Sequence, residues 1–64
     1  MDWAGAESDY SAAIDIDDSI PEAWLGRALC RFNLSKNQEA CADLQKAKEL
    51  GHKLAQEYLD QLCR

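Results

Sequence analysis

The sequence predicts an all-α domain of about four helices, arranged as the antiparallel helix hairpins of an α-solenoid. Apolar residues recur mainly at steps of three and four, which is the spacing of one helix face. No segment shows the alternation or the β-branched enrichment of a strand. The pattern of residues 6–17 also returns in residues 40–51, at an offset of 34. A fixed offset of this size is typical of stacked repeats.

The first predicted helix spans residues 2–17. Asp2 stands directly before its first apolar residue and is the candidate N-cap, because its carboxylate can accept hydrogen bonds from the free amides of the first turn. The apolar residues that define this helix are Trp3, Ala6, Tyr10, Ala13, Ile14 and Ile16. Their spacing places most of them on one helix face.

Residues 20–50 are predicted to form two antiparallel helices joined by a short connection. Each helix follows residues with the form of a capping box, Ser19 with Glu22 and Ser35 with Gln38. The apolar residues at helical spacing are Trp24, Leu25, Ala28, Leu29 and Phe32, then Ala40, Cys41, Leu44, Ala47 and Leu50. These two stripes predict one shared core.

Small residues are expected to decide how closely the two helices pack. Ala28 and Ala40 lie equally far from the turn, so they should face each other and let the backbones approach. Trp24 is expected to pack against the first and third helices. Gly51 follows the third helix, where a positive φ carries no Cβ penalty. A fourth helical stripe follows in residues 52–63, with Leu54, Ala55, Tyr58, Leu59 and Leu62.

The predicted hairpin resembles a tetratricopeptide repeat (TPR). The segments PEAW and QEACADLQKAKELG match best, with an early Trp, a small residue midway in each helix and the spacing Ala40, Leu44, Ala47. The resemblance implies one complete repeat in residues 20–50. It also implies that residues 2–17 are the second helix of a preceding repeat and residues 52–63 a C-terminal capping helix. Because the chain begins on a second-type helix, we expect the C-terminal portion of a longer TPR array.

The resemblance implies a protein-interaction or scaffold module whose inner groove binds a partner peptide or helix. The residues that would line this groove are Leu25, Leu29 and Asn33. The family's clamp for a peptide carboxylate needs a set of Lys, Arg and Asn side chains there, and a face of Leu25, Gly26, Leu29 and Asn33 does not support it. The chain also departs from the Leu, Gly and aromatic residue usual in the family at Arg27, Ala28 and Arg31.

Two alternatives to a binding groove stay open. The row of Leu25, Leu29 and Asn33 would contact a neighbouring helix of the same chain if the domain is a non-binding structural end-cap. The first helix, lacking a helix before it, would instead expose apolar surface and drive self-association into a homodimer through Trp3 and Tyr10.

Charge separates the N-terminal third from the rest of the chain. Residues 1–22 contain seven acidic and no basic residues, whereas residues 23–64 contain five acidic and seven basic ones. This acidic edge is either a solvated face or a surface that steers a basic partner. A net charge of −5 without a basic stripe argues against nucleic-acid binding. The apolar runs are too short for a membrane span.

The cysteines and the single histidine predict neither a metal site nor an enzyme. Cys30, Cys41 and Cys63 form no CxxC pair, and His52 alone cannot complete a zinc site or a catalytic set. We therefore expect no cofactor, no metal and no catalytic residue. Each cysteine falls in a helical stripe and is expected to be reduced, which favours the cytoplasm. A Cys30–Cys41 disulfide across the hairpin is the alternative under oxidation.

Overall fold

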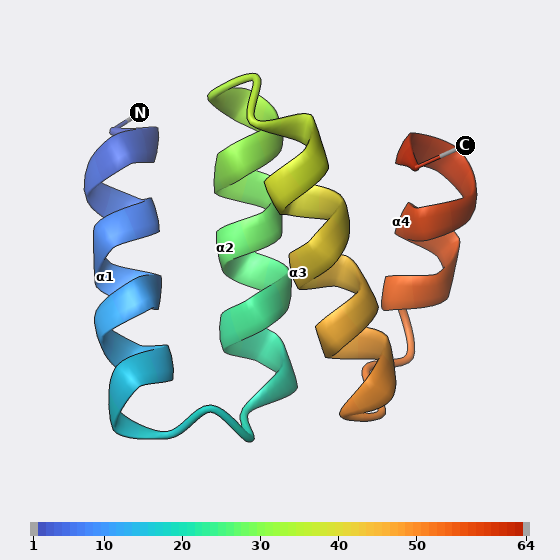
Figure 1. The fold of residues 1–64 in the computed structure, drawn as a ribbon, viewed down its shortest axis with the longest axis horizontal. Coiled ribbons are helices and arrows are strands. Elements are labelled where there is room, and N and C mark those ends of the chain that lie inside the picture. The colour runs from blue at the N-terminus through green and yellow to red at the C-terminus, as the bar shows by residue number, and fades with distance from the viewer. Residues whose placement is uncertain (1, 64) are drawn as a thin grey trace.

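The computed structural model describes residues 2–63. In this range the chain forms four α-helices, which are α1 (Trp3–Ile16), α2 (Pro21–Asn33), α3 (Asn37–Glu49) and α4 (Ala55–Leu62). Figure 1 shows them side by side in chain order, each antiparallel to the one before. The molecule is a slab of 26 × 25 × 16 Å. The prediction of an all-α fold with about four helices is confirmed.

The helix starts agree with the sequence at α1 and differ at the two following helices. The Asp2 carboxylate accepts a hydrogen bond from the Gly5 amide at 2.8 Å, so the predicted N-cap of α1 is confirmed. Both capping boxes are wrong, because the N-cap residues of α2 and α3 are Ile20 and Lys36 and neither has a side-chain cap.

The serines have other roles in these connections. Ser19 donates from its amide and its hydroxyl to the Asp17 carboxylate, at 3.0 and 2.6 Å, so its side chain belongs to the turn before α2. Pro21 already sets the backbone of the first turn of α2. Ser35 adopts φ +62°, a left-handed conformation that an N-cap residue does not take. Both connections therefore use serine for the turn and not for the helix.

The core lies where α2, α3 and α4 meet. Ala28, Ala40 and Leu44 are fully buried in one cluster, which confirms that the two small residues let α2 and α3 approach closely. The partly buried side chains packed against this cluster are Leu25, Phe32, Tyr58, Leu59 and Cys63. Because three of these belong to α4 or its C-cap, α4 completes the core of the hairpin.

The contact between α1 and α2 depends on a glycine. A Cβ atom added to Gly26 would overlap the Tyr10 ring. Ile14 on α1 and Ala23 on α2 are buried as well. Gly26 thus allows the aromatic ring of α1 to lie directly on the backbone of α2.

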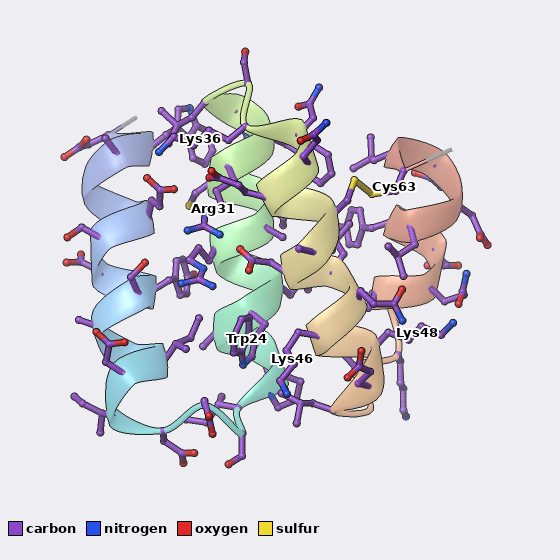
Figure 2. The ribbon with its side chains drawn as sticks, in the orientation of Figure 1. Trp24, Arg31, Lys36, Lys46, Lys48 and Cys63 are labelled. Carbon is purple, nitrogen blue, oxygen red and sulfur yellow. A yellow bond between two sulfur atoms is a disulfide. The ribbon has the colours of Figure 1, made fainter. Side chains whose placement is uncertain are left out.

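The turn after α3 follows the prediction, but the cysteines do not. Gly51 adopts φ +94°, and the His52 amide donates to the Ala47 carbonyl at 2.9 Å. Cys41 and Cys63 form a disulfide, with their Cα atoms 5.9 Å apart, while Cys30 is free and buried. The expectation of three reduced cysteines and the alternative Cys30–Cys41 pairing are therefore both wrong. The reason is tertiary, since α4 folds back along α3 and brings Cys63 beside it (Figure 2).

Within residues 2–63, none of the helices combines the length and the apolar character that crossing a bilayer requires. The cytoplasmic location expected from the cysteines stays a prediction. A disulfide would be unusual in the cytoplasm, because thiol reductants keep cysteines reduced there.

Candidate functional site

The predicted groove row lies along one side of α2, and its three side chains differ in solvent exposure and in their contacts. Leu25 packs against the buried core cluster, and Leu29 is half-buried. Asn33 is exposed, but its amide nitrogen donates to the Leu29 carbonyl at 2.8 Å. Leu29 therefore offers the apolar surface of this row, while the Asn33 amide caps its own helix.

A hollow of about 370 Å³ lies at the N-terminal end of this row. It is bounded by the first turn of α2 and by the connection between α3 and α4, with the lining residues Pro21, Glu22, Gly51, His52, Lys53 and Leu54. Glu22 precedes Leu25 by three residues, so it continues the same side of α2. Leu54 is 46% exposed at the rim. The row and the hollow together make a surface with apolar and charged parts.

The two aromatic residues proposed for self-association do not form the outward side of α1. Tyr10 lies on Gly26 of α2 and is only 37% exposed, and Trp3 is half-buried. Trp3 precedes Tyr10 by two helical turns and shares its side of the helix. The most exposed large apolar side chain of α1 is instead Ile16, at 88%. Self-association through Trp3 and Tyr10 stays a prediction.

An ion-pair layer that sequence reasoning missed lies on the other side of α2. Asp43 on α3 is 2% exposed. Arg27 donates to both of its carboxylate oxygens, at 2.9 and 2.8 Å, and Arg31 donates to Oδ2 at 3.0 Å. A buried carboxylate is tolerated only when it is paired and hydrogen-bonded in this way. The fork of Arg27 gives the bidentate geometry that Arg forms with carboxylates.

The same layer reaches α1 through Glu7. Arg31 Nε donates to Glu7 at 2.9 Å, and Lys36 Nζ donates to its two oxygens at 3.0 and 3.2 Å. Figure 2 shows Arg31 and Lys36 extending toward α1. The hydrogen bond from Arg31, followed by that from Lys36, holds the pKa of Glu7 below its ordinary value. Glu7 is thus charged and ties α1 to the hairpin.

These charged groups are paired with one another, which is the arrangement of a structural network. Among residues 2–63 every buried side-chain nitrogen or oxygen has a hydrogen-bond partner. In the same range no group of three His, Cys, Asp or Glu side chains is placed to hold a metal ion.

Trp24 contacts both the α1–α2 connection, which contains Asp17 and Asp18, and the C-terminal end of α3, which contains Lys46 and Lys48. Its indole Nε1 donates to the Asp18 carbonyl at 2.8 Å. The Arg27 guanidinium lies 4.9 Å from the ring centroid and Lys46 Nζ lies 5.9 Å from it, both within cation–π range. In Figure 2 Trp24 and Lys46 lie next to each other at the same end of the slab. Trp24 therefore fixes the turn before α2 and contacts α3.

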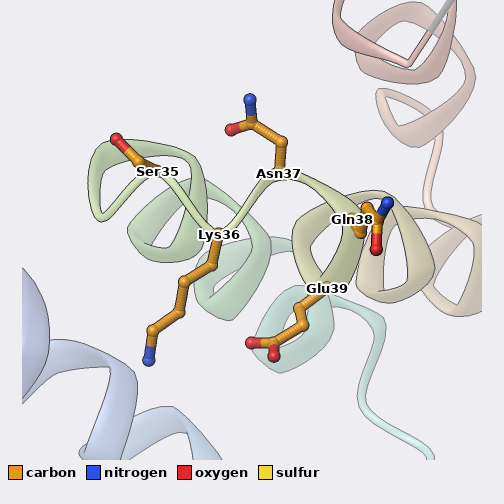
Figure 3. A pocket seen from close by; sticks show the side chains of 5 residues that line it. All are labelled: Ser35, Lys36, Asn37, Gln38 and Glu39. Carbon is orange, nitrogen blue, oxygen red and sulfur yellow. The ribbon is translucent and has the colours of Figure 1, made fainter.

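Two further hollows lie at the opposite end of the hairpin. A polar one of about 260 Å³ is formed by the α2–α3 turn and lined by Ser35, Lys36, Asn37, Gln38 and Glu39. Figure 3 shows its Lys36 pointing toward α1, in agreement with the ion pair to Glu7. The other, of about 400 Å³, is lined by Asn37, Gln38, Cys41, Leu62 and Cys63. It places the disulfide at the surface.

Comparison with known proteins gives no family, relative or structural neighbour. No protein family model matches the chain, and neither a curated protein nor a solved structure matches it. The resemblance to the TPR family therefore depends on the sequence pattern.

Proposed function

We propose that the chain is a protein-interaction module in which α2, α3 and α4 form one TPR-like repeat with its capping helix. Three features support this proposal. Consecutive helices are antiparallel neighbours, Ala28 and Ala40 are buried together, and α4 packs on the core that α2 and α3 share. A stiff frame of this kind suits a module that presents a fixed surface.

The observation that carries the proposal is the hollow next to Leu54, because it continues the row along α2. Leu54 lines this concave space and is 46% exposed. Leu29 is half-buried and lies two helical turns beyond Glu22 on the same side of α2, so it would extend the apolar surface. A partner peptide or helix would place an apolar side chain there and run along Leu29 toward Asn33. Asp15 in the last turn of α1 and Asp18 in the connection to α2 lie at the same end of the slab and would steer a basic partner.

Selection from a displayed peptide library tests this proposal. The library is selected on the folded, oxidised protein, and the enriched peptides are then measured against the variants Leu29→Lys and Leu54→Lys. We expect each variant to weaken binding by about 1–3 kcal/mol, since a charge replaces apolar contact surface. Thermal unfolding by circular dichroism verifies that the variants stay folded.

Leu62→Lys is the matched control. Leu62 is also 46% exposed on α4, but it lines the hollow beside the disulfide. It should leave peptide binding unchanged. If no peptide is enriched, or if Leu62→Lys weakens binding as much as Leu54→Lys, the groove is not the binding surface. A structural end-cap would then be the better account of the chain.

A further inference from the structure

We propose that the Cys41–Cys63 disulfide is a thiol–disulfide exchange site, and that its reduction by a dithiol releases α4 from the hairpin. The proposal concerns α4 and the disulfide and does not depend on the peptide groove. It rests on three properties of this part of the chain: the dependence of α4 on its docking, the access to the disulfide and the surface that α4 covers.

Helix α4 owes its order to docking. It has eight residues, and an isolated helix of this length is not stable in water. Its apolar contacts with the hairpin are made by Ala55, which is fully buried, and by Tyr58 and Leu59, which are partly buried against the core cluster. The disulfide fixes its other end, because Cys63 is the C-cap residue of α4. The helix is thus held by a short apolar face and by one covalent link.

The disulfide is open to a reactant. Cys41 and Cys63 are both half-buried and both line the open hollow of about 400 Å³. A thiolate can therefore approach a sulfur atom without unfolding the chain. Cys30 differs from them, since it is 3% exposed in the core and its burial raises the pKa of the thiol. The structure separates two cysteines that can exchange from one that is protected.

The reductant in this exchange is a dithiol, which supplies both electrons and both protons. One thiolate of the dithiol attacks a sulfur of the Cys41–Cys63 bond, forms a mixed disulfide and expels the other cysteine as a thiolate. The second thiol of the dithiol then displaces the protein cysteine and closes its own disulfide. Two electrons pass to the protein, and the two protons of the dithiol end on Cys41 and Cys63. The reverse reaction with an oxidised dithiol restores the link.

Release of α4 would uncover apolar surface on the hairpin. Tyr58, Leu59 and Cys63 are packed against the cluster that contains the fully buried Leu44. Without the link, Cys41 and Cys63, which are 22 positions apart in the sequence, no longer close a loop, and the released chain gains conformational freedom. By contrast, α1 to α3 remain connected by the ion pairs of Glu7, Arg31 and Asp43. Opening is therefore expected to be local.

Hydrogen exchange and pulsed alkylation, both read by mass spectrometry, test the proposal on the full chain. The protein is compared before and after treatment with dithiothreitol under native conditions. The matched control is Cys30→Ala, which removes the free cysteine and keeps the disulfide. We expect the amides of α4 to exchange up to roughly a hundredfold faster after reduction, while those of α2 and α3 keep their protection. Iodoacetamide should label Cys41 and Cys63 at least about tenfold faster than Cys30.

Each other outcome overturns the proposal. If the native protein resists dithiothreitol, the disulfide is not an exchange site. If reduction leaves the protection of α4 unchanged, the link does not hold the helix. If Cys30 is labelled at the same rate as the other two cysteines, reduction unfolds the whole chain. The variant Cys63→Ser must reproduce the exchange pattern of the reduced protein, and failure to do so counts against the disulfide as the cause.

Discussion

Removing the Asp43 carboxylate should strongly destabilise the fold. In the variant Asp43→Ala, Arg27 loses two hydrogen bonds and Arg31 loses one, and both guanidinium groups are left without their buried counter-ion. Breaking a fully buried pair costs about 3–5 kcal/mol. The two arginine side chains are 14% and 20% exposed, so water relieves part of this penalty. We therefore expect a loss of about 3 kcal/mol in the free energy of unfolding.

Such a loss is large for this chain, because a domain of this size has a total stability of roughly 3–9 kcal/mol. It should lower the Tm by roughly 15 °C. The assay is urea unfolding at neutral pH, followed by circular dichroism. Asp9→Ala is the control, since Asp9 is exposed on α1 and its removal should change stability by less than about 0.5 kcal/mol.

A compensated variant separates lost pairing from lost volume. In Arg27→Leu with Asp43→Leu the buried charge and its main partner are both replaced by apolar groups, and Arg31 keeps its bond to Glu7. Replacing a buried pair by apolar residues is often neutral or stabilising, so the double variant should regain most of the stability. The reasoning is refuted if Asp43→Ala costs no more than Asp9→Ala, or if the double variant is no more stable than Asp43→Ala.

Three further predictions concern α1, Gly26 and Gly51. The pKa of Glu7 is lower in the folded chain than in the unfolded one. Its charge therefore stabilises the fold fully at pH values above the ordinary pKa of Glu, and this stabilisation is lost as the pH falls through the lower pKa of the folded chain. When the free energy of unfolding is measured against pH, the variant Glu7→Gln should lose less stability in acid than the parent. Gly26→Ala should cost about 1–3 kcal/mol, because its methyl group overlaps the Tyr10 ring; purely additive effects in a double-mutant cycle with Tyr10→Ala would contradict this. Gly51→Ala should cost about 1 kcal/mol in the same urea assay, since φ is +94°, and an unchanged midpoint would show that the turn relaxes without strain.

Local sequence features predicted the helices well, because helix formation depends on residues that are close together in the chain. The step of three and four residues placed all four helices, Asp2 marked the start of α1, and Gly51 marked the turn after α3. The contact of Ala28 and Ala40 also followed from their equal distance to a short turn. The two predicted capping boxes failed because the sequence form, a Ser followed three residues later by Glu or Gln, does not fix the backbone conformation of the serine. At Ser35 the turn requires a positive φ, which an N-cap residue does not take.

The ion-pair layer and the disulfide could not be derived from local patterns. Glu7 lies 24 residues from Arg31, and Cys41 lies 22 residues from Cys63, so each pairing depends on how whole helices pack. One signal was present in the sequence. Asp43 falls between Ala40 and Ala47 on the buried side of α3, and an acidic residue on an apolar face predicts a paired, buried charge. Its partners would then be sought among the arginines of α2.

The ion-pair layer and the proposed groove use opposite sides of α2. An α-helix turns by about 100° per residue, so residues two positions apart point in nearly opposite directions. Arg27 and Arg31 therefore face away from Leu29, which lies between them in the sequence. One side of α2 is joined to α1 and α3 by ion pairs, while the other carries the row of Leu25, Leu29 and Asn33 and borders the hollow at its first turn. Leu25 also packs against the core cluster, so Leu29 is the member of the row at which the proposed binding can be tested without breaking an ion pair, whereas substitutions in the ion-pair layer act first on stability.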